Sequence, residues 1–133
     1  MKRTKFNARA MLTRLGGKRS RPRSQVEPET NATLEAIWDV ISAIPSGRVS
    51  TYGDVAVMAG LPRTHARQTA YALRHAPEDM HLPWHRVLGA GGKIVFPKGS
   101  KHHREQARRL RSDGVLVKDG RVPRALMIDV ELR

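Results

Sequence analysis

The stretch STYGDVAVMAGLPRTHARQTAYALRHAPED, residues 50–79, predicts two short helices joined by a tight turn. Its first part, GDVAVMAG, reads as a short helix that Gly60 and Pro62 bring to an end. The β-branched residues just before it, in RVSTY, indicate one short strand of a small ribbon. Two short helices around a glycine-containing turn are typical of a helix-turn-helix, although many other helical pairs share that pattern.

The second helix of the pair is expected within RTHARQTAYALRHAPED, residues 63–79. Thr64 is a plausible N-cap, and Pro77 would close the helix. The apolar positions expected to face inward are Ala66, Ala70 and Leu73. That arrangement leaves Arg67 and Arg74 facing outward.

Upstream, TNATLEAIWDVISAIPSG (residues 30–47) predicts a longer amphipathic helix behind Thr30 or Asn31 as the cap. Its apolar positions recur at helical spacing, and we expect Trp38 to be a core residue. Pro45 and the Gly47 that follows would stop the helix. The apolar positions are Leu34, Ile37, Trp38, Ile41 and Ile44.

Downstream, a glycine-rich turn and a short KIVF strand precede SKHHREQARRLRSDG, residues 100–114, which predicts a basic helix from Ser100 to Gly114. VLVKDGRVP, residues 115–123, predicts a hairpin because Asp119-Gly120 suits a type I′ turn. His102 and His103 are adjacent and would point to different faces, so they make a poor metal pair. No zinc spacing or phosphate-binding loop is present.

Charge is the strongest global signal in the 133 residues, which carry 25 Lys and Arg, 12 Asp and Glu, and a formal net charge of +13. Such an excess favours a polyanionic partner, and nucleic acid before a membrane. No apolar run approaches the roughly 20 residues that span a bilayer. The chain has no cysteine, which excludes disulfides, thiolate metal sites and a cysteine nucleophile.

The basic excess is concentrated at the N-terminus, so we expect a basic, disordered arm over residues 1–29 and a DNA-binding domain over residues 30–133. Residues 1–24 contain nine Lys or Arg and no acid. The arm is open to three interpretations: a solvated tail, a segment that grips DNA phosphates, or an organelle transit peptide. The candidate phosphate contacts are Lys2, Arg3, Arg19, Arg21 and Arg23.

The motif PWHRV, residues 83–87, follows the predicted helix pair, and its Trp84 lies seventeen residues beyond Arg67. Together with STYGDVAVMAG and a helix that ends in SDGV, it resembles the alkylguanine-DNA alkyltransferases. Those repair proteins carry Pro-Cys-His-Arg-Val, and their cysteine removes the alkyl group from guanine O6. Trp84 occupies the cysteine position, as in the alkyltransferase-like proteins, which bind alkylated DNA without repairing it. The implied fold is mostly α with short β-hairpins, namely the helix-turn-helix (winged-helix-like) C-terminal domain of that family.

The resemblance assigns roles residue by residue. Tyr52 matches the tyrosine that pushes on the phosphate beside the target nucleotide, and Arg67 matches the arginine finger that fills the vacated stack. Trp84 and His85 match the reactive cysteine and its histidine neighbour. Asp113 stands where the family usually has a glutamate behind that histidine. The resemblance also implies that the helix-turn-helix docks in the minor groove.

Several positions depart from the family pattern. Ala70 and Tyr71 replace a glycine pair, and Ala76 replaces an asparagine that normally precedes the proline. Asp113 is one methylene shorter than the usual acid. One extra residue between Tyr52 and Arg67 predicts a longer turn around residues 63–65. These departures bear on fine geometry more than on the overall assignment.

Chemistry alone excludes direct alkyl transfer at Trp84. That reaction needs a soft, ionisable nucleophile, and an indole offers one N–H donor and no accessible anion. His85 has no adjacent thiol or hydroxyl to activate. An indole can instead present an apolar wall to a flipped base, and an O6-alkyl group adds about 0.8 kcal/mol per buried carbon.

The sequence therefore predicts a non-enzymatic sensor that binds duplex DNA in the minor groove and flips O6-alkylguanine into a pocket. By resemblance, the complex would mark the lesion for nucleotide excision repair proteins. We expect a monomer in the cytoplasm, nucleoid-associated if bacterial, with no cofactor, metal or membrane. Two alternatives remain open: a helix-turn-helix regulator or architectural protein without lesion preference, and a glycosylase that uses His85 or Asp113.

Overall fold

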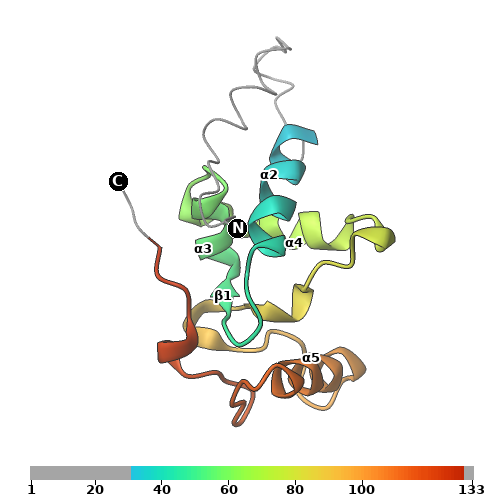
Figure 1. The fold of residues 1–133 in the computed structure, drawn as a ribbon, viewed down its shortest axis with the longest axis vertical. Helices are drawn as coiled ribbons and strands as arrows, with labels where there is room; N and C mark the ends of the chain where they lie inside the picture. The colour runs from blue at the N-terminus through green and yellow to red at the C-terminus, as the bar shows by residue number, and fades with distance from the viewer. Residues whose placement is uncertain (1–30, 131–133) are drawn as a thin grey trace.

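Helix α2, Asn31–Ser42, is the first element of the computed structural model, which describes residues 31–130 (Figure 1). The predicted helical spacing is confirmed, because Ile37, Ile41 and Ile44 are buried, while Leu34 and Trp38 pack on the edge of the same cluster. The Trp38 indole donates a hydrogen bond of 2.7 Å to the carbonyl of Ala72, which joins α2 to α4.

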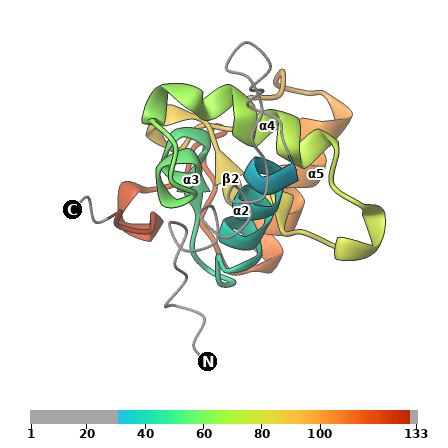
Figure 2. The same cartoon turned by 90° about the horizontal axis from the view of Figure 1, so that it is seen from above.

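Helices α3, Tyr52–Met58, and α4, Ala66–Arg74, form the predicted pair. Gly60 adopts φ +91° in the turn after α3, a left-handed conformation that suits glycine, and Pro62 follows. A short 3-10 helix at Arg63–His65 then leads into α4. α2 lies beside this pair and packs on it (Figure 2).

The only paired strands in the described residues are β1, Ser50–Thr51, and β2, Val87–Leu88. They are parallel, with Ser50 opposite Val87, so the strand expected at RVSTY is present as one half of a two-stranded ribbon. A parallel pair needs a crossover, and α3 and α4 lie within it. This pairing places the start of α3 next to the PWHRV segment, although the two are far apart in the sequence.

Helix α5, Lys101–Ser112, begins as predicted, because Ser100 accepts a 3.2 Å hydrogen bond from the N–H of His103. The predicted turn at Asp119–Gly120 is also confirmed. Both residues have positive φ, +52° and +73°, as a type I′ turn requires. Lys118 and Arg121 exchange backbone hydrogen bonds of 3.0 Å across it.

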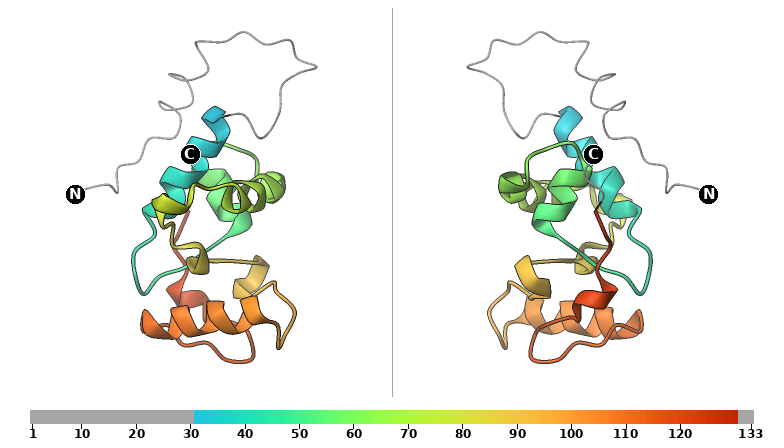
Figure 3. Two further views of the ribbon diagram at one scale, coloured as in Figure 1. Left: turned by 90° about the vertical axis from the view of Figure 1, so that its right-hand side faces the viewer. Right: turned by 90° about the vertical axis from the view of Figure 1, so that its left-hand side faces the viewer.

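Two clusters of buried apolar side chains form the core. One lies among α2, α3 and α4, and the other lies between β2, α5 and the segment that follows α5. α5 therefore lies at the end of the molecule away from α2 (Figure 3). The cluster beside α5 consists of Val49, Leu88, Ile94, Ala107, Leu110, Val115, Val117 and Val122.

Two local predictions are wrong. Thr64 does not cap α4, because it lies within the 3-10 helix, and the N-cap position falls on His65 with no side-chain cap. The KIVF segment is not a strand, because only its Lys93 forms β-bridges, in isolated pairs with Gly89 and Arg121, and the rest of the segment forms none. Among residues 31–130, no helix is long and apolar enough to cross a bilayer.

Candidate nucleic-acid interface

Local hydrogen bonds fix the start of α3 against α4. The Thr51 hydroxyl caps α3 by accepting a 3.0 Å hydrogen bond from the N–H of Asp54. Asp54 forms an ion pair with Arg63 in the connecting turn. The buried hydroxyl of Thr69 on α4 donates to the carbonyl of Tyr52 at 2.9 Å. These contacts therefore fix the position of Tyr52 relative to the outer face of α4.

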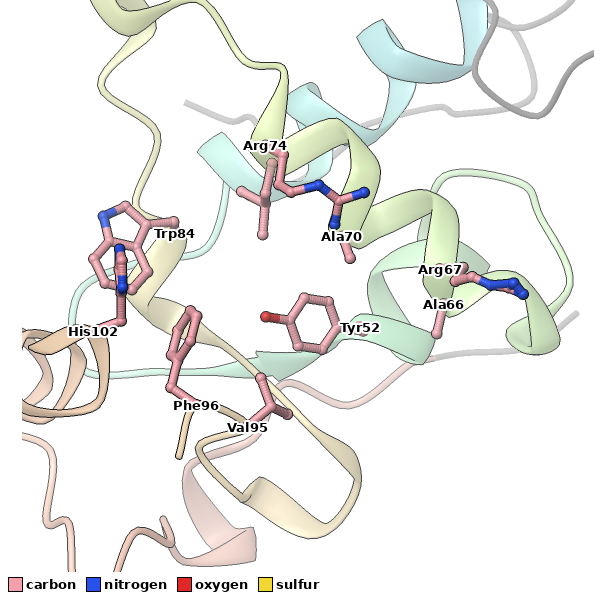
Figure 4. A pocket seen from close by; sticks show the side chains of 10 residues that line it. Tyr52, Ala66, Arg67, Ala70, Arg74, Trp84, Val95, Phe96 and His102 are labelled. Carbon is pink, nitrogen blue, oxygen red and sulfur yellow. The ribbon is translucent and has the colours of Figure 1, made fainter. Parts of the chain in front are cut away.

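A pocket of about 800 Å³ opens between α4 and the segment that carries Trp84 (Figure 4). Its volume lies in the range of roughly 300–1,000 Å³ that is typical of small-molecule sites. α4 supplies one side, and Trp84 and Phe96 lie across from it. The lining residues are Tyr52, Ala66, Arg67, Ala70, Leu73, Arg74, Trp84, Val95, Phe96 and His102.

Three of the five residues predicted for the lesion site line this one pocket: Tyr52, Arg67 and Trp84. They come from the start of α3, the first turn of α4 and the PWHRV segment. The other two, His85 and Asp113, do not line it. The structure therefore divides the predicted residues into a pocket group and a supporting group.

Aromatic neighbours enclose Trp84. The ring of Phe96 meets it edge to face, with centroids 6.2 Å apart and an interplanar angle of 85°. The Arg109 guanidinium from α5 lies 5.5 Å from the centroid of the indole ring, within cation–π distance. His102 stacks on Phe96 at 5.2 Å. The indole is only partly buried, so it presents a rigid apolar surface to the pocket.

The polar groups at the pocket are cationic or neutral. Arg67 and Arg74 are on its wall, and no carboxylate of residues 31–130 lines it. Burial raises the pKa of the Tyr52 hydroxyl, and the positive charge of Arg74 partly offsets that rise. Tyr52 is therefore neutral at physiological pH, and an anionic phosphate would meet no negative charge from it.

Asp113 lies behind His85, and the two side chains form a hydrogen bond of 2.9 Å between Nε2 and Oδ2. Arg86 binds the same carboxylate from Nε at 2.8 Å and from Nη2 at 3.2 Å, in a two-pronged pair. These contacts hold the pKa of Asp113 down to about 2, with the Arg86 hydrogen bond as the largest cause. Burial lowers the pKa of His85 and outweighs its bond to Asp113.

Gln106 on α5 forms hydrogen bonds to the backbone on either side of Arg86. Its amide nitrogen donates to the carbonyls of His85 and Val87, at 3.0 and 3.1 Å. Gln106 is itself buried, so these bonds form in a site shielded from water. The PWHRV segment is thus held from behind by α5 and by Asp113, and Trp84 is carried on a fixed backbone.

Four residues with charged or aromatic side chains at or near the pocket were not predicted as site residues: Arg74, Phe96, His102 and Arg109. Arg74 could have been found, because it lies seven residues after Arg67 and so shares its face of a helix. Phe96 sits in an irregular loop, and no periodicity connects it to Trp84. His102 and Arg109 also lie seven residues apart, but only the packing of α5 shows which face they occupy.

The predicted inward face of α4 is right for Leu73, which packs on the core, and wrong for Ala66 and Ala70. The buried residues are Thr69 and Ala72, with Leu73 partly buried, whereas Ala66 and Ala70 line the pocket. Thr69 can be buried because its hydroxyl bonds to the Tyr52 carbonyl. The small side chains at positions 66 and 70 leave room between α4 and the aromatic side. Ala70 and Tyr71, which replace the family's glycine pair, therefore do not close the pocket.

The predicted phosphate contacts of the N-terminal arm, Lys2, Arg3, Arg19, Arg21 and Arg23, lie outside the described residues, as does the boundary at residue 30. Their role remains a prediction.

The site can bind a ligand, but it holds no thiol that could accept an alkyl group, because the chain contains no cysteine. The residue at the acceptor position of the Pro-Cys-His-Arg-Val motif is the indole of Trp84. In residues 31–130, no three His, Asp or Glu side chains gather closely enough to hold a metal ion. What the pocket offers is an apolar, partly aromatic cavity with guanidinium groups at its wall.

Comparison with known proteins agrees with this geometry. Residues 32–115 match the model of the 6-O-methylguanine DNA methyltransferase, DNA binding domain family. The DNA base-flipping protein of Escherichia coli (strain K12) is 38% identical over 96 residues, which cover 72% of each chain. Alkyltransferase-like protein 1 of Schizosaccharomyces pombe is 39% identical over 79 residues, 59% of this chain and 72% of the relative.

The fold is also similar to the crystal structure of S. pombe Atl1 in complex with damaged DNA containing O6-carboxymethylguanine. That match has a TM-score of 0.64 and 31% identity, and it covers 72% of this chain and 94% of the other. The chain therefore belongs to the family of the 6-O-methylguanine DNA methyltransferase DNA-binding domain and, with Trp84 at the acceptor position, is similar to its alkyltransferase-like members.

Proposed function

We propose that this protein binds duplex DNA, flips an O6-alkylated guanine into the pocket beside Trp84, and holds it there without removing the alkyl group. The observation that carries the proposal is the convergence of Tyr52, Arg67 and Trp84 on one cavity of about 800 Å³. These residues come from three separate segments of the chain. A plain helix-turn-helix that reads base edges in a groove has no need for such a cavity.

Trp84 forms the wall that meets the alkyl group. Its indole is apolar and partly exposed to the cavity, and Phe96 and Arg109 hold it in place. Each alkyl carbon buried there contributes about 0.8 kcal/mol. Unmodified guanine lacks this surface and gains nothing from the wall. The pocket can therefore prefer the lesion without any bond being made or broken.

Arg67 and Tyr52 make extrusion of the base possible. Flipping a base costs a few kcal/mol, and less when damage has already weakened its pairing. Arg67 is exposed at the start of α4, so its side chain is free to enter the stack that the base leaves. Tyr52 lies below α4 in the same pocket and is fixed by the cap at Thr51. It would press on the neighbouring phosphate.

His85 and Asp113 support the site without reacting. Their hydrogen bond and the Arg86 pair lock the PWHRV segment, and neither side chain lines the cavity. The glycosylase alternative would need His85 or Asp113 within reach of the flipped base, so this arrangement does not favour it.

The remaining parts of the proposal concern context. The helix pair would dock in the minor groove, and the persistent complex would recruit nucleotide excision repair proteins, as the family resemblance implies. We expect the protein to act in the cytoplasm. The Lys and Arg residues of the first 24 positions would add phosphate contacts that carry no base identity. We expect the protein to act as a monomer.

The test is a competition titration with two duplexes that differ only at one O6-methylguanine. The proposal expects the protein to prefer the modified duplex, with the methyl group still on the DNA at the end of the incubation. Equal affinity for both duplexes would support the rival helix-turn-helix regulator. A free base or a cut strand would support a glycosylase.

A further inference from the structure

Helix α5 borders a second concave surface, on the side away from Trp84. A groove of about 370 Å³ lies between α5 and the turn at Asp119–Gly120. Its floor is small and apolar, and cationic side chains stand along it. The lining residues are His103, Arg104, Ala107, Arg108, Arg111, Val117 and Gly120. We call this surface the α5 groove.

The α5 groove and the pocket lie on nearly opposite sides of α5. Successive residues of a helix are rotated by about 100°. His102 and Arg109, which face Phe96 and Trp84, therefore lie roughly 170° around the helix axis from the mean direction of the groove residues. A duplex held at the pocket would leave the α5 groove uncovered, at the end of the molecule away from α2 (Figure 3).

α5 is strongly cationic. The sequence of its 12 residues, KHHREQARRLRS, holds five Lys or Arg and a single carboxylate, Glu105. Glu105 pairs with Arg108 and Arg109, and these two guanidiniums lower the pKa of its carboxyl group to about 2. No carboxylate is left on α5 to compensate Arg104 and Arg111.

Arg104 and Arg111 are held in place by neutral groups. Arg104 donates from Nη1 to the carbonyl of Gly99 at 2.6 Å, and Arg111 donates from Nη2 to the carbonyl of Val117 at 3.0 Å. A guanidinium has five N–H donors, so each arginine keeps free donors after this bond. The two side chains are seven residues apart, which is about 10.5 Å along the helix. They are positioned cations with unused hydrogen-bonding capacity.

We propose that the α5 groove is a second binding site for the phosphate backbone of nucleic acid, so that one protein molecule can hold two DNA segments. A duplex carries one negative charge per about 1.7 Å of its axis, so its phosphates reach both arginines in any register. Guanidinium groups also match phosphate oxygens in two-pronged pairs. An acidic protein would have to present carboxylates at the one spacing set by Arg104 and Arg111. The site does not rest on lesion binding.

The experiment measures bridging of two duplexes by the full chain. Protein is bound to beads through a short biotinylated duplex, in one arm with O6-methylguanine and in the other without it. A fluorescent undamaged duplex is then added at several salt concentrations. The fluorescence retained per bound protein measures binding of the second duplex at the α5 groove. The ratio of protein bound in the two arms measures the preference for the lesion, which is the proposed function. The two proposals can therefore fail separately.

The combined variant Arg104→Gln/Arg111→Gln should lower retention of the fluorescent duplex by roughly fivefold or more. The slope of log affinity against log salt should fall by about 0.9 for each phosphate that the variant no longer neutralises. Arg108→Ala serves as a second variant, because its side chain is 66% exposed and Glu105 stays paired with Arg109 in its absence. It should lower retention in the same direction. Arg124→Ala, exposed and outside the groove, should change nothing.

Four results would overturn the proposal. The first is that the wild-type protein retains no second duplex, and the second is that the groove variants retain as much as the wild type. The third is that retention depends only on residues 1–24, which would assign bridging to the N-terminal arm. The fourth is that polyglutamate displaces the second duplex as well as DNA of equal charge does, which would favour an acidic protein partner.

Discussion

Replacing Trp84 with alanine is expected to weaken binding to the damaged duplex selectively. The indole is held by Phe96 at a centroid distance of 6.2 Å and by Arg109 at 5.5 Å, and it lines the pocket. The indole carries no charge, so it should add little to the affinity for the phosphates of undamaged DNA. Trp84→Ala should therefore change the preference for the lesion more than the general affinity for DNA.

The magnitude follows from the alkyl group. Burial of one methyl carbon contributes about 0.8 kcal/mol, which corresponds to a roughly fourfold preference. The aromatic contact between Trp84 and Phe96 stabilises the position of the indole by about 0.5–1.5 kcal/mol beyond the area it buries. Trp84→Ala should thus reduce the preference for O6-methylguanine by up to about fourfold, which would abolish it.

The assay is fluorescence anisotropy with matched duplexes, and Trp38→Phe is the control. Trp38 packs on the core and donates a 2.7 Å hydrogen bond to the Ala72 carbonyl, and it does not line the pocket. Trp38→Phe should lower the free energy of unfolding by about 0.5–1.5 kcal/mol and leave the lesion preference unchanged. Equal losses of affinity on both duplexes for a folded Trp84→Ala protein would refute the reasoning and make Trp84 structural.

Three further predictions concern the other residues of the site. Arg67→Ala should lower affinity and abolish the fluorescence increase of a base analogue at or beside the flipped position; an unchanged increase would mean that another group fills the stack. Tyr52→Phe should be mild and Tyr52→Ala severe in the same binding assay, because the push on the phosphate is steric; equal effects would assign the role to the hydroxyl. Folding stability, measured by urea unfolding, should decrease in two windows as the pH is lowered. The folded state lowers the pKa of His85, so the contribution of His85 to the free energy of unfolding is full above about pH 6.5 and is lost as the pH falls below that value. The folded state also lowers the pKa of Asp113, so its contribution is full above about pH 3.8 and is lost as the pH falls towards 2. Asp113→Asn should reduce the acid window, to which Glu105 also contributes, and an unchanged pH profile in that variant would contradict the assignment.

Local features of the fold were predictable from the sequence wherever one segment determines its own structure. The spacing of Ile37 and Ile41 predicts the buried face of α2, and the serine at position 100 predicts the start of α5. Asp119-Gly120 adopts the positive φ angles that its turn requires. In each case the decisive interaction lies within a few residues, so periodicity, a cap or a turn residue reports it.

Features that depend on distant segments were not predictable in this way. Alanine is compatible with either a core or a pocket wall, so sequence alone could not tell which side of α4 holds Ala66 and Ala70. The deciding contact is the bond from Thr69 to the Tyr52 carbonyl, seventeen residues away. The parallel pairing of β1 with β2 and the approach of Phe96 to Trp84 likewise depend on tertiary packing.

The site was predicted through a resemblance and not through periodicity. The PWHRV motif identified Trp84 and His85, and the SDGV that ends the basic helix identified Asp113; the structure shows a His85–Asp113 bond at 2.9 Å. Their roles toward DNA remain predictions. Arg67 and Arg74 were both predicted to face outward, and both are exposed, but Arg74 was not predicted to share the pocket wall with Arg67.

Native mass spectrometry tests the central claim most directly. The protein is mixed with equal amounts of the O6-methylguanine duplex and of its unmodified counterpart, and the masses of the complexes and of their dissociated components are recorded. The account predicts that the complex with the modified duplex dominates, that the released DNA keeps its methyl group, and that the protein mass is unchanged. Equal populations of the two complexes, or a methyl group transferred to the protein, would contradict it.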